Sequence, residues 1–123
     1  MIDRALLVEA SELFNRKLYF ECHDLLEDAW AGERGEDRAF LQALIHVAVG
    51  LYHLAAGNRQ GAANLLGSGI EGLAPFLPER HGLDVAALSE RASLCLEKCR
   101  RALAGEEIEW VPDDVPVMTP SLG

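Results

Sequence analysis

The sequence has few basic residues. It carries 11 lysines and arginines against 20 aspartates and glutamates, which gives a net charge of −9 over 123 residues. A chain with this charge repels nucleic-acid phosphates, because binding to them depends on clustered lysine and arginine. The nearest approach to a basic patch is Lys98, Arg100 and Arg101, near the end of a predicted helix where cations complement the helix dipole. We therefore expect no nucleic-acid partner.

Cysteine is also scarce, and its number is odd. Cys22, Cys95 and Cys99 each fall within an apolar helical pattern. Cysteines of this kind pack as small hydrophobic side chains in reduced, intracellular proteins, so we expect a cytoplasmic location and no disulfide framework. Cys95 and Cys99 are four residues apart on one helix face, where a metal or a redox pair is the alternative. Two cysteines alone are too few for a structural zinc site.

The sequence lacks a long hydrophobic run and a signal peptide. The longest apolar candidate, from Phe40 to Ala56, is interrupted by Gln42, His46 and His53. A membrane-spanning helix needs roughly 18 or more consecutive apolar residues. The first turns of the chain carry acidic residues instead of the positively charged start of a secretory signal. We therefore expect no membrane partner.

What the sequence does contain is the pattern of an all-α protein. A chain of 123 residues, 50% of them hydrophobic, can bury a core without disulfides. Its apolar residues recur with helical periodicity, and glycines and prolines separate the periodic segments. The pattern predicts five helices, at about residues 3–16, 19–31, 37–56, 60–73 and 84–104. We expect one helical domain over residues 1–106 and an extended tail over residues 107–123, loose at its end.

Two of the predicted helix pairs resemble each other. With a shift of 40 residues, the stretch KLYFECHDLL aligns with GNRQGAANLL, so that Leu25–Leu26 meets Leu65–Leu66. Two helix–turn–helix units of this kind indicate stacked helical hairpins, as in a minimal tetratricopeptide-like pair. The expected fold is a compact bundle of two such hairpins and a closing C-terminal helix. The segment PFLPERHGLD is expected to be a loop, and residues 108–111 are the single candidate strand.

A polar stripe borders the core face of the second predicted helix. At roughly 100° per residue, His23, Glu27 and Trp30 lie on one edge of the apolar stripe, whereas Asp24 and Asp28 point to solvent. The stripe is therefore not simply the solvated side of an amphipathic helix.

A second stripe of polar and small residues follows the third predicted helix, which is otherwise apolar. It consists of Gln42, His46, Gly50 and His53, and the glycine allows close approach of a backbone or ligand. Because the second and third helices are joined by a short connection, we expect them to be antiparallel neighbours whose stripes meet. That arrangement would gather His23, Glu27, His46 and His53, with Gln42 and Trp30 at the rim.

Three interpretations of this cluster are open. The first is a structural network of satisfied polar groups between two helices. The second is a zinc, iron or manganese site with His23, Glu27, His46 and His53 as ligands, since imidazoles and carboxylates on facing helices bind such metals. The third is metal-free acid–base chemistry in which Glu27 tunes His23. No serine or cysteine is evidently placed as a nucleophile, so the catalytic residues are unknown.

The chain also resembles a known family. The run YFECHDLLEDAW at residues 19–30, followed by FLQ at 40–42, YH at 52–53 and GNRQGA at 57–62, is similar to the bacterial and archaeal domain-of-unknown-function family 309. The resemblance covers about residues 14–66 and implies an all-helical fold without an assigned activity. Its signature residues map onto Glu21, His23, Asp24, Glu27, Trp30, Gln42, His53 and Asn58. Asn58 also suits a cap of the fourth helix, and Gly61 would permit a close helix crossing.

The sequence favours a non-enzymatic binding or structural role, because it shows neither a nucleophile nor a complete set of metal ligands. In that role a groove would hold a protein partner, a second copy of the chain in a homo-oligomer, or a small polar ligand. The alternative is a metal-binding protein, such as a hydrolase, with a divalent metal as its cofactor.

Overall fold

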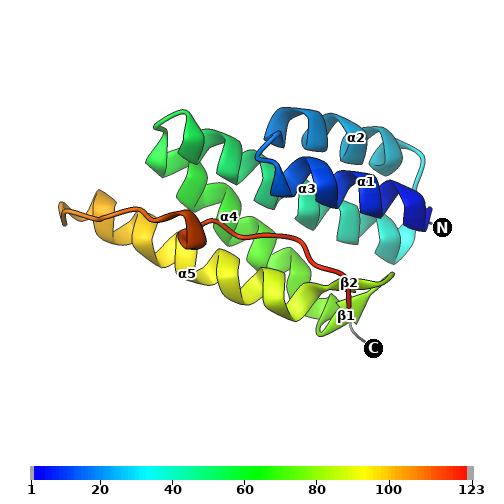
Figure 1. Ribbon diagram of the computed structural model, residues 1–123. Coiled ribbons are helices and arrows are strands. Elements are labelled where there is room, and N and C mark those ends of the chain that lie inside the picture. The colour runs from blue at the N-terminus through cyan, green and yellow to red at the C-terminus, as the bar shows by residue number, and fades with distance from the viewer. Residues whose placement is uncertain (1, 122–123) are drawn as a thin grey trace.

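Five α-helices and one short β-hairpin make up the computed structural model, which describes residues 2–121 (Figure 1). The helices are α1 (Arg4–Asn15), α2 (Tyr19–Ala31), α3 (Gly35–Ala55), α4 (Arg59–Leu73) and α5 (Val85–Leu103). The other elements are the 3-10 helices η1 (Ala74–Phe76) and η2 (Pro112–Asp114) and the strands β1 (Glu79–Arg80) and β2 (Leu83–Asp84). The predicted all-α fold is confirmed, with helix boundaries close to those expected from periodicity.

Short polar side chains fix where three of the helices begin. Asp3 caps α1 by accepting a hydrogen bond from the Ala5 amide, at 3.0 Å. Asn58 caps α4 and Asp84 caps α5 in the same way, each accepting from a backbone amide three residues ahead at 2.9 Å. The cap predicted at Asn58 is confirmed. Such caps satisfy amides that have no partner within the first helical turn.

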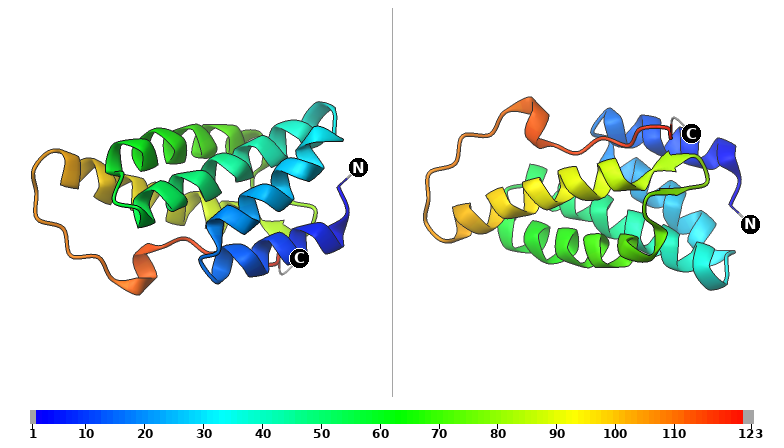
Figure 2. Two further views of the ribbon diagram at one scale, coloured as in Figure 1. Left: turned by 90° about the horizontal axis from the view of Figure 1, so that it is seen from above. Right: turned by 90° about the horizontal axis from the view of Figure 1, so that it is seen from below.

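The central element is α3, which packs between α2 and α4 (Figures 1 and 2). Among residues 2–121 it is also the one helix long and apolar enough to cross a membrane, and half of its apolar window is buried inside the protein. The helix gains this length because it begins at Gly35, with a charged first turn before Phe40, while the apolar run itself is still interrupted by polar residues as noted in the sequence. The central helix of a bundle meets the same criteria of length and composition, since it is covered on most sides.

Small residues let α3 and α4 approach closely. A Cβ atom added to Gly69 would lie 2.6 Å from Cγ2 of Val47, and one added to Gly50 would lie 3.1 Å from the Leu66 amide nitrogen. The close approach predicted at Gly50 is thus made by the backbone of α4. Gly61 has a different role from the one predicted, because its own added Cβ would meet the Asn58 side chain at 2.7 Å. Its small size leaves room for the helix cap and not for a helix crossing.

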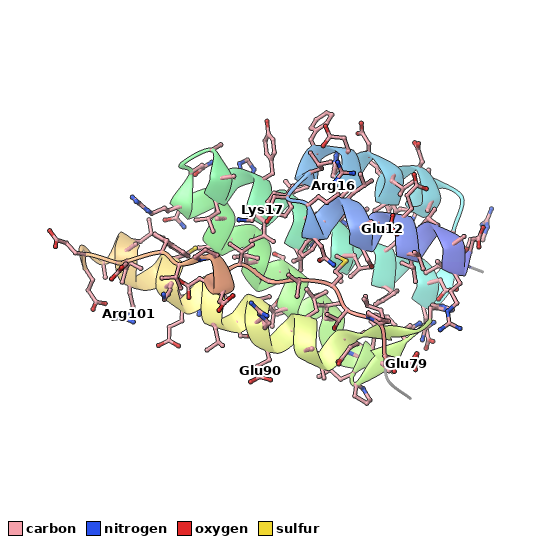
Figure 3. The ribbon with its side chains drawn as sticks, in the orientation of Figure 1. Glu12, Arg16, Lys17, Glu79, Glu90 and Arg101 are labelled. Atoms are coloured by element: carbon pink, nitrogen blue, oxygen red, sulfur yellow. The ribbon has the colours of Figure 1, made fainter. Side chains whose placement is uncertain are left out.

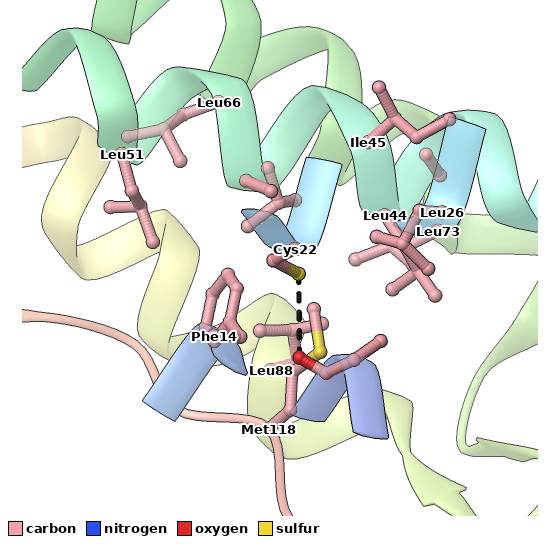
Figure 4. Close-up of a cluster of buried hydrophobic side chains, with 14 of the residues drawn as sticks. Phe14, Cys22, Leu26, Leu44, Ile45, Leu51, Leu66, Leu73, Leu88 and Met118 are labelled. Carbon is pink, nitrogen blue, oxygen red and sulfur yellow. Dashed lines mark hydrogen bonds between the residues drawn. The ribbon is translucent and has the colours of Figure 1, made fainter. Parts of the chain in front are cut away.

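The core is formed by apolar side chains from all five helices and the C-terminal segment (Figure 4). At its centre Cys22 is fully buried, and its thiol donates a weak hydrogen bond to the Ala10 carbonyl at 3.4 Å. Burial raises the pKa of Cys22 to about 12, so its thiol stays protonated at neutral pH. Cys95 and Cys99 are also buried and free, which confirms that the cysteines pack as small hydrophobic side chains. Charged side chains, by contrast, lie on the outside of the bundle (Figure 3).

The segment between α4 and α5 is a hairpin rather than the expected loop. Strands β1 and β2 pair in antiparallel fashion around His81 and Gly82, whose φ angles are 51° and 83°. Two adjacent residues with positive φ are typical of the type I′ turn, whose twist matches that of paired strands. The candidate strand at residues 108–111 does not form.

Ionic hydrogen bonds fasten this hairpin to the start of α3. Asp37 accepts from Nη2 of Arg80 at 2.8 Å and lies 2.7 Å from Nε2 of His81. Partial burial of Asp37 raises its pKa, but the hydrogen bonds from Arg80 and His81 outweigh this effect and lower the pKa to about 2. The carboxylate is therefore ionised throughout the neutral range.

After α5 the chain turns back and runs along the bundle to the hairpin (Figure 2). The Asn15 side chain makes two hydrogen bonds of 2.8 Å to the backbone of Met118, whose side chain is buried. Further on, the Ser121 amide donates to the Gly82 carbonyl at 2.7 Å. The expectation of a loose end is therefore wrong as far as Ser121, and residues 122–123 lie outside the described part of the chain.

Candidate functional site

A depression of about 160 Å³ opens between α2 and α3. It is lined by Tyr19, Phe20, His23, Val49, Tyr52 and His53. Pockets for drug-sized ligands have volumes of roughly 300–1,000 Å³. This depression therefore has room for one side chain or one small head group.

Four aromatic rings form the walls of this depression. The ring centroid of Phe20 lies 6.0 Å from that of His23 and 6.2 Å from that of Tyr52, and Tyr52 lies 6.0 Å from His53. The planes of neighbouring rings are tilted by 51°, 52° and 65°, so the rings face different directions. We call these four residues, Phe20, His23, Tyr52 and His53, the aromatic pocket.

Two of these rings are unusually exposed for their size. Phe20 is 54% exposed and Tyr52 is 46% exposed, although both are large and largely apolar. Tyr19, in contrast, is buried and packs edge-on against Phe14 at 5.5 Å, and burial raises its pKa to about 12. The pocket thus has a fixed base and two rings that face solvent.

Carboxylates flank one wall of the pocket. Nε2 of His23 lies 2.6 Å from Oε2 of Glu27, one helical turn away, and its Nδ1 lies 3.5 Å from Oδ1 of Asp24. The side chain of His23 is 25% exposed, whereas those of Glu27 and Asp24 are 54% and 61% exposed. Glu21 and Asp28 are exposed as well, and α2 contains no lysine or arginine. The outer surface of α2 is therefore strongly acidic.

The two polar stripes predicted from the sequence meet only in part. His23 and His53 line the same pocket, as expected for facing stripes. His46 does not join them, because its Nε2 lies 2.8 Å from Nε2 of Gln42 on the same helix. Burial lowers the pKa of His46, which favours its neutral form.

The remaining predicted residues lie in other local contacts. Trp30 is covered by the guanidinium of Arg38, 3.9 Å from the ring centroid, which links the end of α2 to the start of α3. Asn58 caps α4, and its Nδ2 lies 3.4 Å from Nδ1 of His53. Trp30 and Gln42 are not among the residues that line the pocket.

Two of the three interpretations of the polar cluster lose support. Throughout residues 2–121, no three histidine, cysteine, aspartate or glutamate side chains are grouped so that they could hold a metal ion. The predicted ligand set of His23, Glu27, His46 and His53 is therefore not assembled. A buried polar network is not formed either, since the structure buries no polar or charged residue in the part of the chain it describes. His23 and His53 lie instead beside the exposed rings of Phe20 and Tyr52.

Phe20 and Tyr52 are not among the site residues predicted from the sequence. One signal could have identified Phe20, because it falls outside the stripe of Leu18, Cys22 and Leu26 that forms the core face of α2. Tyr52 carries no comparable signal, since α3 is apolar on nearly every side and its exposed strip depends on which helices cover it.

These observations define the class of the protein: a small all-α bundle with an aromatic pocket on the surface between its second and third helices. Residues 7–65 match the family model described as Domain of unknown function (DUF309), which is the family that the sequence resembles. The matched segment includes α2, α3 and every residue of the pocket. The resemblance noted in the sequence is therefore confirmed. Comparison with curated proteins finds no match.

Proposed function

We propose that the protein is a binding module without catalytic activity, whose aromatic pocket holds one projecting side chain of a protein partner. The observation that carries this proposal is the exposure of Phe20 and Tyr52 beside each other at the mouth of a depression. Aromatic side chains in pockets supply much of the energy in protein interfaces, because they bury a large area at a low entropic cost.

The chemistry of the lining supports binding over catalysis. Among the described residues that line the pocket there is no serine, threonine or cysteine that could act as a nucleophile. Of the two histidines, His23 is engaged by Glu27 at 2.6 Å, and His53 has the Asn58 amide beside its ring. A metal-dependent hydrolase finds no support, because the described donors do not form a ligand set.

Photo-crosslinking tests this proposal. A benzoylphenylalanine placed at Tyr52 in cells that express the protein should give a defined crosslinked product. The matched control is the same group at Leu94, which is 60% exposed on α5 and lies outside the pocket lining. The partner crosslinked at position 52 is then purified and titrated with the unmodified protein.

The proposal predicts that Phe20→Ala weakens this affinity by about tenfold or more, as expected for a central interface aromatic, while Leu94→Ala leaves it unchanged. The melting temperature of both variants should stay close to that of the parent, since both side chains are largely exposed. The same products at positions 52 and 94, or an affinity that is insensitive to Phe20, would refute the role of the pocket. A product of twice the chain mass would identify a second copy as the partner.

A further inference from the structure

The walls of the aromatic pocket are suited to a cation. A positive charge is attracted to the face of an aromatic ring when it lies within about 6 Å of the ring centroid. The rings of Phe20 and Tyr52 are of this kind and their centroids lie 6.2 Å apart at the depression, so a group seated there can approach both. The imidazoles of His23 and His53 flank them, with centroids 6.0 Å from Phe20 and Tyr52 respectively. Neighbouring rings are tilted by 51°, 52° and 65°, so they present walls of different orientation to such a group.

The charges around the pocket also favour a cation. Glu27 and Asp24 lie against the two nitrogens of His23, at 2.6 Å and 3.5 Å, directly behind one wall. The whole chain has a net charge of −9. The basic residues around α2 lie at its two ends: Arg16 and Lys17 in the turn from α1 (Figure 3), and Arg38 on the ring of Trp30 outside the pocket lining.

The pocket offers little to a cation that needs hydrogen-bond acceptors. Phe20 and Val49 have no polar side-chain atom and Tyr19 is buried, so the hydroxyl of Tyr52 is the main acceptor of the lining besides the histidines. The histidine nitrogens have neighbours of their own, since His23 contacts two carboxylates and Nδ1 of His53 lies 3.4 Å from Nδ2 of Asn58. An unmodified lysine ammonium has three donors and is strongly hydrated, so it would lose hydrogen bonds on entering. A trimethylated ammonium has no N–H donor and carries its charge on apolar methyl groups, so it needs no hydrogen-bond acceptor.

We propose that the aromatic pocket binds a trimethylated ammonium group, which is the chemistry shared by an N-trimethylated lysine side chain and a choline head group. This inference rests on the proposed function, because it names the side chain that the pocket would take from a partner. Aromatic cages are a known solution for this class of cation. Here the structure supplies the rings, the apolar base and the flanking carboxylates at one place on the surface.

The first test compares choline with 3,3-dimethylbutan-1-ol, which has the same shape without the charge. Each is titrated into the full chain at neutral pH, and binding is followed by the NMR signals of the aromatic rings and the α2 amides. We expect choline to bind in the millimolar range and to shift the signals of Phe20 and Tyr52, with the neutral alcohol at least about fivefold weaker. Equal affinities would overturn the inference, because they would show an apolar pocket indifferent to charge.

Variants identify the groups responsible. Phe20→Ala and Tyr52→Ala should each weaken choline binding severalfold, whereas Leu94→Ala, at a position on α5 that is 60% exposed, should not. Glu27→Gln keeps the size of the flanking side chain but removes its charge, and should also weaken binding. Retained NMR dispersion in each variant shows that the fold is intact. Choline affinity that does not change in Phe20→Ala would place binding elsewhere and overturn the inference.

A second titration distinguishes the two sources of the cation. Two peptides of the same sequence carry either trimethyllysine or unmodified lysine at one position. Tighter binding of the trimethyllysine peptide than of choline, with the unmodified peptide weaker by tenfold or more, assigns the site to methylated protein. Binding of choline alone assigns it to a free head group. If neither methylated compound binds at tens of millimolar, the inference fails, whereas the crosslinking result at Tyr52 still decides the proposed function separately.

Discussion

Gly67 and Gly69 are two residues apart on α4, yet replacing each with alanine should change stability in opposite directions. At Gly67 an added Cβ would meet no heavy atom within 4 Å. At Gly69 it would lie 2.6 Å from Cγ2 of Val47, 3.1 Å from the Val47 amide nitrogen and 3.2 Å from the Ala43 carbonyl oxygen. The chemical change is the same in both variants, so the difference between them isolates the packing of α4 against α3.

The magnitudes follow from two opposing effects. Alanine in place of a helical glycine stabilises a protein by roughly 0.5–1 kcal/mol, because the unfolded chain loses conformational freedom. At Gly67 this gain should appear in full. At Gly69 it is opposed by overpacking, which costs about 1–3 kcal/mol in a tightly packed core. The free energy of unfolding should therefore be lower in Gly69→Ala than in Gly67→Ala by about 1–3 kcal/mol.

Urea denaturation followed by circular dichroism at 222 nm measures both values. The midpoint should rise for Gly67→Ala and fall for Gly69→Ala, with slopes like that of the parent, since neither change alters the surface exposed on unfolding. Equal shifts of the two midpoints in the same direction would refute the close helix contact inferred at Gly69. A destabilised Gly67→Ala variant would contradict the open surroundings of that residue.

Three further predictions test other contacts. Asp37→Asn should lower the free energy of unfolding at pH 7 by about 1–2 kcal/mol. Folding lowers the pKa of Asp37 from 3.8 to about 2, so the stabilisation by its carboxylate is lost as the pH falls through this range. In a series of urea titrations, the difference between variant and parent should therefore disappear between about pH 4 and pH 2. Asn15→Ala removes two hydrogen bonds to Met118 and should lower the free energy of unfolding by about 1–3 kcal/mol. Hydrogen exchange at the Met118 amide should become faster. The control Asn64→Ala, on the exposed face of α4, should leave exchange at that amide unchanged. Asn58→Ala removes the cap of α4 and should lower the melting temperature by the equivalent of about 0.5–2 kcal/mol, and an unchanged melting temperature would show that this cap contributes nothing.

The exposed polar residues of α2 contribute little to stability. Removing His23 would leave Glu27 without its partner, but the Glu27 side chain is 54% exposed and can be hydrated. Exposed ion pairs contribute only about 0–1 kcal/mol. Substitutions of these residues should therefore change stability little, so that an effect on binding can be measured in a folded protein.

The sequence by itself determined the helices and their ends. Periodicity of apolar residues located α1 to α5, because a helix must bury one continuous face. Asn58 and Asp84 marked two helix starts, since their short side chains accept hydrogen bonds from free backbone amides. These signals are local, and a single chain displays them without any knowledge of its neighbours.

Only the tertiary structure decided what the surface between α2 and α3 contains. Periodicity placed His23, His46 and His53 on the edges of two helices, but rotation and spacing of the helices determined that His46 turns to Gln42 while His53 joins His23. The same packing left Phe20 and Tyr52 uncovered. Exposure of a side chain depends on which elements lie over it, and those elements are distant in sequence. The docking of the C-terminal segment through Asn15 was hidden for the same reason, since its hydrogen bonds join residues 103 apart in the chain.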